Sequence, residues 1–212
     1  MKTKKFTTSQ LTILGLMAGI LFLMAYTPLG YLNIGPLAVT FNVIPVAVCA
    51  IVLGPTGGAI AGAVFGLTSF MQAIGIGGVI ALGSALFQIN PFMTAVQCFG
   101  PRILDGICIG FIYRAVHKKA NTYVSCAVTG FFSAFLNTLF FMTALIVMFG
   151  NTELIRNLMG GHNIIVGCCL MVGVNAISEM VSSTIITAAV GTALSKAHLI
   201  PAVQIVKTDT AA

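Results

Sequence analysis

The sequence predicts an all-α membrane protein with six transmembrane helices, and charge, hydropathy and length lead to this fold class. Its 212 residues include ten Lys or Arg and four Asp or Glu, so charged side chains make up only 7%. Hydrophobic residues make up 58%, and the mean hydropathy is +1.06. An average soluble domain carries about 25% charged residues, and so few charges cannot cover a water-exposed surface. A soluble globular domain, a disordered chain and a secreted disulfide scaffold are therefore excluded, and the bilayer is the expected solvent.

The length sets the number of helices. A spanning helix needs about 20 apolar residues, and a connection needs about 3–12 more, so the chain holds six spans and no soluble catalytic domain. Breaks at Pro, Gly and charge clusters divide it into elements. The predicted helices lie in one domain, residues 1–195, and cover 11–27, 38–53, 56–74, 91–116, 123–149 and 163–194. The tail 196–212 is polar, and we expect it to be cytoplasmic and disordered.

The connections in the first half are rich in turn-forming residues. The first apolar run, Leu11–Thr27, has no cleavage motif after it, so we interpret it as a helix rather than a signal peptide. Pro28–Leu37 is expected to be a loop, and Gly54–Pro55 is expected to form a tight turn between the second and third helices. Gly75–Asn90 holds too much glycine for a span, and we predict a capping loop that is partly helical.

The second half begins with a clear helix start. Pro91 suits the first turn of the fourth helix. Gly150–His162 is expected to be the loop between the fifth and sixth helices.

The basic residues predict the orientation. They cluster before the first helix, between the fourth and fifth helices, and after the sixth, at Lys2, Lys4, Lys5, Arg114, Lys118, Lys119, Lys196 and Lys207. With six spans all three clusters fall on one side, which the positive-inside rule assigns to the cytoplasm. Both termini are therefore expected to be cytoplasmic.

Charged and amide side chains inside the spans are the first candidate site. Arg102 and Asp105 are three residues apart on one helical face, and Asn175 and Glu179 are four apart. Asn137 lies at a similar depth in the fifth helix. A charge at mid-membrane costs about 2.5 kcal/mol or more, so these residues are expected to converge. Two interpretations stay open: a substrate site, or a structural network in which Arg102 pairs with Glu179.

A second polar set is predicted nearer the outer surface, at the ends of several helices. Together these residues could line a small-molecule pocket open to the outside. The candidates are Asn42, Gln72, Asn90, Gln97 and Asn163.

Small residues on the first helix are a candidate docking face. Gly15 and Gly19 are four residues apart, and Ala18 extends the small surface. This spacing lets another helix approach closely. The partner is either a neighbouring helix of the same chain or another protein.

Three stretches together resemble a known family. They are PLGYLNIGPLAVTFNVIPVAVCAIVLGPTGGAIAGAVFGLTSF (28–70), NPFMTAVQCFGPRILDGICIGFIYR (90–114) and the NAISE segment at 175–179. They are similar to the substrate-binding S component of an energy-coupling factor (ECF) vitamin transporter, most of all to pantothenate-binding members. Riboflavin and other vitamin-binding members share much of the pattern, so another vitamin is the alternative substrate.

The resemblance implies a fold, partners and roles. It implies six helices, a prokaryotic cell-membrane location, and a vitamin pocket facing outward under the loops between helices 1–2 and 3–4. It also implies docking, through the small face of the first helix, on a transmembrane T subunit driven by two ATPases. Family members often carry an alanine pair where this chain has Gly15, Ala18 and Gly19. No cofactor is expected in this chain, because the partner ATPases use the ATP.

Pantothenate has one carboxylate, an amide and two hydroxyls, so it needs one cation and several polar partners. Arg102 is the intramembrane cation and the candidate partner of the carboxylate. Asn90, Gln97, Asn137 and Asn163 are candidates for the amide and the hydroxyls. If Arg102 instead pairs with Glu179, then Asn90 and Gln97 would carry recognition.

Other functions compete with this interpretation. The chain lacks the P-loop, H-E-x-x-H and G-x-S-x-G motifs, and no nucleophile with a base in reach is evident, so we expect no enzyme. An autonomous secondary carrier that uses Asp105 or Glu179 as a proton relay is the main alternative. A channel or structural subunit is a further one.

Overall fold

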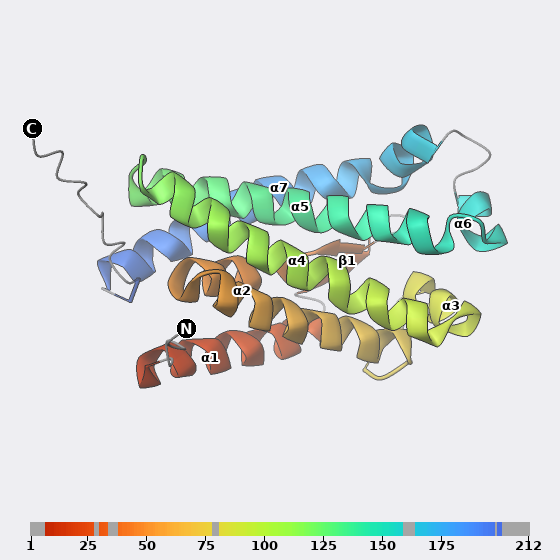
Figure 1. The fold of residues 1–212 in the computed structure, drawn as a ribbon, viewed down its shortest axis with the longest axis horizontal. Helices are drawn as coiled ribbons and strands as arrows, with labels where there is room; N and C mark the ends of the chain where they lie inside the picture. The colour runs from red at the N-terminus through yellow and green to blue at the C-terminus, as the bar shows by residue number, and fades with distance from the viewer. Residues whose placement is uncertain are drawn as a thin grey trace, which may run out of the picture.

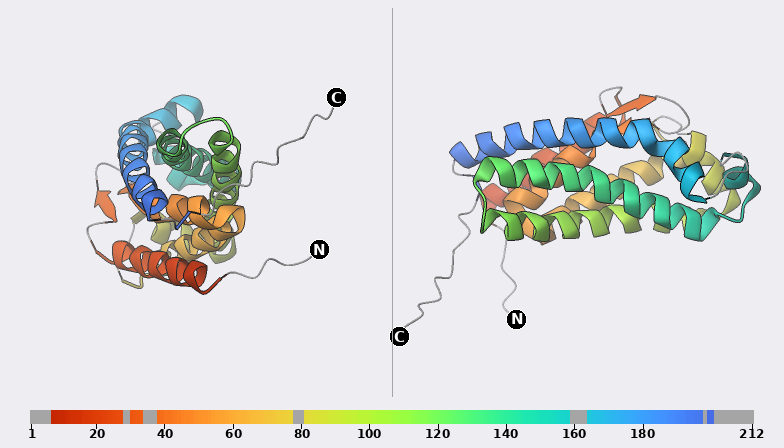
Figure 2. Two further views of the ribbon diagram at one scale, coloured as in Figure 1. Left: turned by 90° about the vertical axis from the view of Figure 1, so that its left-hand side faces the viewer. Right: turned by 90° about the horizontal axis from the view of Figure 1, so that it is seen from above.

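The structure is a computed structural model that describes residues 7–27, 30–33, 38–77, 81–158, 164–197 and 199–200. These residues form a bundle of long helices (Figure 1), and a short β-hairpin lies on the side of the bundle (Figure 2). The long helices are α1 (Thr8–Ala25), α2 (Val43–Ala73), α4 (Pro91–His117), α5 (Thr122–Phe149) and α7 (Ile164–Lys196). The shorter elements are β1 (Tyr31–Asn33), β2 (Ala38–Thr40), α3 (Ala81–Ile89) and α6 (Glu153–Leu158).

Five helices are long and apolar enough to cross a membrane: α1, α2, α4, α5 and the Asn175–Lys196 part of α7. They run along the long axis of the bundle (Figures 1 and 2). In Figure 1, α1 begins and α7 ends at the same end, where α4 also connects to α5. α3 and α6 lie at the opposite end. The chain is therefore a helical membrane protein whose two ends differ in structure.

α2 consists of two helical segments that fold back on each other at Gly54. This residue has φ 73° and ψ −164°, a backbone conformation that glycine adopts without a steric penalty. A Cβ added at Gly58 would lie 3.0 Å from the Cβ of Ala50. In a continuous helix residues eight apart are separated by about 12 Å, so the chain reverses direction between them. The turn predicted at Gly54–Pro55 is thus confirmed.

Glycines hold the second segment of α2 directly against α4. A Cβ at Gly58 would meet the carbonyl group of Gly106, and a Cβ at Gly62 would meet that of Arg102. Gly66 continues the row one turn later, against the α4 backbone. Residues four apart share one helix face, so the row fixes α4 at the turn that carries Arg102.

The predicted helix 38–53 is wrong at its start, because Ala38–Thr40 forms β2. This strand pairs antiparallel with β1, in the register Tyr31 with Thr40 and Asn33 with Ala38. The backbone N–H of Phe41 also donates to the carbonyl of Gly30, at 3.1 Å. Val39 and Thr40 are β-branched, and β-branched residues favour strands. The helix begins only at Val43.

Two segments predicted as loops contain helix. α3 occupies nine residues of the predicted capping loop Gly75–Asn90, which is therefore partly helical as expected. α6 occupies six residues of the predicted loop Gly150–His162, because Ile155, Leu154 and Leu158 pack on the end of α5. The predicted disordered tail lies mostly outside the described residues.

Candidate functional site

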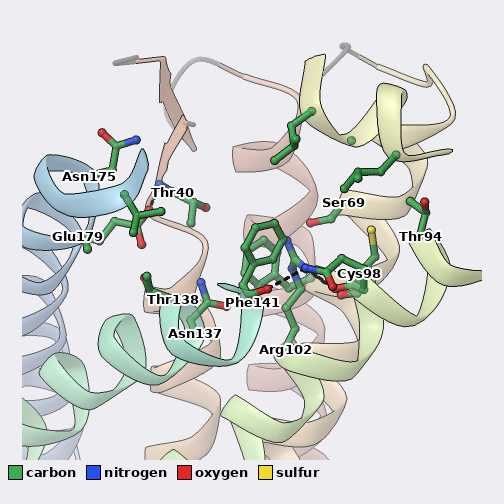
Figure 3. Close-up of a pocket in the computed structure, with 17 residues that line it drawn as sticks. Thr40, Ser69, Thr94, Cys98, Arg102, Asn137, Thr138, Phe141, Asn175 and Glu179 are labelled. Atoms are coloured by element: carbon green, nitrogen blue, oxygen red, sulfur yellow. Dashed lines mark hydrogen bonds between the residues drawn. The ribbon is translucent and has the colours of Figure 1, made fainter. Parts of the chain in front are cut away.

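A cavity of about 120 Å³ lies between α2, α4, α5 and α7, with α3 and β2 beside it (Figure 3). Five predicted site residues line it: Gln97, Arg102, Asn137, Asn175 and Glu179. Most of the other lining side chains are apolar, with several hydroxyl groups among them. They are Thr40, Phe65, Ser69, Leu82, Gly83, Leu86, Thr94, Cys98, Thr138, Phe141, Val172 and Ala176.

The position of Arg102 follows from the proline before it. Pro101 has no N–H, so the carbonyl of Gln97 loses its usual helical donor. Nη1 of Arg102 donates to this carbonyl at 3.2 Å and to the carbonyl of Cys98 at 3.0 Å. The guanidinium carbon also lies 4.7 Å from the ring centroid of Phe65 and 5.4 Å from that of Phe141. Arg102 is therefore held at the cavity by carbonyl oxygens and aromatic faces.

Arg102 forms no ion pair with a carboxylate within the described part of the chain. Its hydrogen bonds there go only to the two carbonyls, and Nε is buried without a partner. The pairing of Arg102 with Glu179, one of the two interpretations of the sequence, is therefore not what the structure has. A cation in a buried site favours an anion, so the cavity is suited to a ligand with a negatively charged group.

Glu179 lies at another wall of the cavity, where it contacts the hairpin. Its Oε1 accepts a 2.6 Å hydrogen bond from the backbone N–H of Thr40 in β2. The residue is 5% exposed. Because backbone N–H groups fix the acceptor that they contact, this bond joins α7 to the hairpin and holds the carboxylate at the cavity wall.

Amide side chains supply neutral hydrogen-bonding groups. Asn137 is 7% exposed, lines the cavity and forms no hydrogen bond with any residue that the structure describes. Asn175 also lines the cavity, on the α7 face that carries Glu179. Gln97 donates from Nε2 to the carbonyl of Phe141 at 2.9 Å and thereby joins α4 to α5. A ligand amide or hydroxyl could therefore find partners here, Asn137 first.

Two predicted residues have structural contacts outside the cavity. Nε2 of Gln72 donates to the carbonyl of Ala25 at the end of α1, at 2.5 Å. Oδ1 of Asn90 accepts from the backbone N–H of Met93 at 3.1 Å and caps the N-terminus of α4. Neither residue lines the cavity.

Asn42 and Asp105 are buried away from the cavity. Asn42 is 0% exposed, and neither atom of its side-chain amide has a partner among the described residues. Asp105 is 2% exposed, and its Oδ1 likewise has none. Asp105 is three residues from Arg102, but only Arg102 lines the cavity. Asn163 lies outside the described residues.

The aromatic rings of the cavity and the hydroxyls of Ser69, Thr94 and Thr138 were not predicted from the sequence, although helical spacing identifies several of the lining residues. Thr94 and Cys98 share a face of α4 with Arg102, at intervals of four residues. Phe141 is four residues after Asn137 in the same way. Inspecting the positions three or four residues from each predicted site residue identifies Thr94, Cys98 and Phe141.

The two glycines of the candidate docking face on α1 lie apart from the other residues that the structure describes. Gly15 and Gly19 are exposed, and no atom that the structure describes lies within 4 Å of a Cβ added at either one. Ala18 is partly buried. The opposite face of α1 packs on α2 through Leu14, Met17 and Leu21. A neighbouring helix within the described chain therefore does not explain the small residues.

Comparison with known proteins identifies the family. The model of the family described as "ECF transporter, substrate-specific component" matches residues 9–191. The chain belongs to this family. Curated relatives include the pantothenate transporter PanT of Leuconostoc mesenteroides, 33% identical over 178 residues that cover 81% of each chain. The pantothenic acid transporter PanT of Lactococcus lactis is 28% identical over 208 residues, 92% of this chain and 98% of its own.

Membership of this family gives the helical bundle a role in transport. An ECF substrate-specific component is a transport subunit, and this one is a multi-pass protein of the cell membrane. The cavity between its long helices, with one cation and several amides, is the candidate substrate site of such a component.

Proposed function

We propose that this chain is the pantothenate-binding subunit of an ECF vitamin importer. The observation that carries the proposal is Arg102, a cation that faces the cavity without a carboxylate partner in the described chain. Two relatives with the name PanT support pantothenate as the vitamin. Arg102 also favours pantothenate over riboflavin, because pantothenate has a carboxylate and riboflavin has none. Guanidinium and carboxylate groups form strong, directional hydrogen bonds.

Pantothenate would bind with its carboxylate at Arg102. Nη2 of Arg102 has no hydrogen-bond partner among the described residues and keeps its two donors for the ligand. The ligand amide would meet Asn137, and the apolar carbons would contact Leu82 and Leu86 of α3. The asparagine would thus select ligands that carry amide or hydroxyl groups.

The bundle would cross the membrane six times, because the two segments of α2 run in opposite directions. Arg114, Lys118, Lys119 and Lys196 would then lie on the cytoplasmic side with both termini. The cavity, which α3 borders at the opposite end of the bundle, would face outward (Figure 1).

Transport would need partners. The face of α1 that carries Gly15, Ala18 and Gly19 would dock on a transmembrane T subunit, and two ATPases would supply the energy. This chain would bind its vitamin without catalysis and without a cofactor of its own.

Uptake into proteoliposomes tests this proposal. Radiolabelled pantothenate should accumulate only when the chain is reconstituted with an ECF module and internal ATP. A module with an ATPase that cannot hydrolyse ATP is the control. Uptake by the chain alone, driven by a proton gradient, would instead establish the secondary carrier.

A further inference from the structure

The cavity has a positive side and a negative side. Figure 3 shows Arg102 and Glu179 on opposite sides of the cavity, with Asn137 between them. We propose that Glu179 determines specificity by accepting a hydrogen bond from a ligand hydroxyl at the end remote from the carboxylate. This inference rests on the proposed function, because it takes pantothenate as the ligand.

The geometry of Glu179 suits an acceptor. The backbone N–H of Thr40 bonds only to Oε1, and no other hydrogen bond to this carboxylate occurs among the described residues. Buried carboxylates need further donors. Since Glu179 lines the cavity, a ligand bound there can supply that donor. The hydrogen bond from the backbone N–H of Thr40 holds the carboxylate at the cavity wall.

The two charges fix the direction in which the ligand binds. A carboxylate gains hydrogen bonds at Arg102, whereas beside Glu179 it meets a like charge in a poorly hydrated site. A hydroxyl, in contrast, can donate to Glu179. The cavity therefore selects a monoanion with hydroxyls at its other end, and it disfavours a ligand with a carboxylate at both ends. Pantothenate meets this requirement, because its two hydroxyls lie at the end opposite the carboxylate.

Two analogues and one variant test the role of Glu179. The full-length protein in detergent is titrated with pantothenate and with two deoxy analogues, one without the primary hydroxyl and one without the secondary hydroxyl. The variant is Glu179→Gln, whose side-chain oxygen still accepts from Thr40. The matched control is Glu153→Gln, the same change at an exposed site in α6. Thermal unfolding with and without pantothenate checks that each variant folds.

We expect that changing Glu179 and removing one ligand hydroxyl lower the affinity through the same hydrogen bond. A hydrogen bond to a charged group contributes about 1.5–3 kcal/mol, so Glu179→Gln should weaken pantothenate binding about tenfold or more. One deoxy analogue should bind wild type about tenfold more weakly than pantothenate does, and Glu179→Gln should leave its affinity unchanged. Glu153→Gln should change the affinity for none of the three ligands.

Three outcomes overturn the inference. If Glu179→Gln weakens all three ligands equally, the residue acts only through the hairpin or the fold. If neither hydroxyl matters in wild type, no hydroxyl is recognised at Glu179. If wild type binds no pantothenate at all, the proposed function fails first, so the two failures are distinguishable.

Discussion

Nη1 of Arg102 donates a 3.2 Å hydrogen bond to the carbonyl oxygen of Gln97, the same carbonyl that Pro101 leaves without a helical donor. The Pro-Arg step thus creates an acceptor and supplies the side chain that uses it. Because Nη1 donates to two carbonyl groups of α4, the guanidinium is already oriented before a ligand binds. Preorganisation of this kind lowers the entropic cost of binding.

The first prediction is that Pro101→Ala separates stability from affinity. Alanine restores the N–H to the Gln97 carbonyl, so Arg102 loses an acceptor and becomes more mobile. We expect the affinity for pantothenate to fall about fivefold, which corresponds to the loss of one ordinary hydrogen bond. The thermal midpoint should stay the same or rise, because an interior proline disfavours a helix. A parallel fall of both quantities would contradict this explanation.

The second prediction concerns the glycines between α2 and α4. Gly62→Ala places a Cβ against the carbonyl group of Arg102, and relief of such a clash typically costs about 1–3 kcal/mol. We expect a lower thermal midpoint in detergent. Gly15→Ala is the matched control, because no described atom lies within 4 Å of the new Cβ. Equal midpoints for the two variants would show that the row of glycines does not limit the approach of the helices.

The third prediction separates a cavity amide from a structural one. Asn137→Ala should weaken pantothenate binding by about two- to tenfold and leave the thermal midpoint unchanged, because Asn137 bonds no described residue. Gln72→Ala should do the reverse, because its amide holds the end of α1. Calorimetric titration and thermal unfolding of both variants make this comparison. If only Gln72→Ala lowered the affinity for pantothenate, the ligand would not be recognised at Asn137.

The fourth prediction concerns docking. Gly15→Leu and Gly19→Leu fill the exposed small face of α1 without touching the cavity. We expect unchanged pantothenate affinity but little co-purification with the T subunit and its ATPases. Leu16→Ala, an exposed position on the same helix, is the control for a change in α1 itself. Normal complex formation by both leucine variants would move docking to another surface.

The sequence predicts most of the fold because local chemistry decides it. Gly54–Pro55 was predicted as a turn and Pro91 as a helix start. The structure has a turn at the first, and α4 begins at the second. The strand Ala38–Thr40 was not predicted, because three residues directly before a helix start resemble one more helical turn. Only pairing with residues 31–33 distinguishes them.

The candidate site was predicted less completely, because tertiary packing decides which polar residues meet. Arg102, Asn137 and Glu179 stand out as polar groups in apolar spans, and all three line the cavity. Gln72 stands out equally, yet it bonds to Ala25. The spacing of Arg102 and Asp105 gave no sign that only the first would reach the cavity.

The most direct test is a titration of the purified chain with pantothenate and with pantothenol, in which an alcohol replaces the carboxylate. We predict one-to-one binding of pantothenate that Arg102→Gln weakens about 100-fold, the effect of losing about two charge-assisted hydrogen bonds. Arg156→Gln, an exposed arginine in α6, should leave the affinity unchanged. Pantothenol should bind weakly to wild type and to Arg102→Gln alike. Absence of pantothenate binding, or equal pantothenate affinity in wild type and Arg102→Gln, would contradict the central claim.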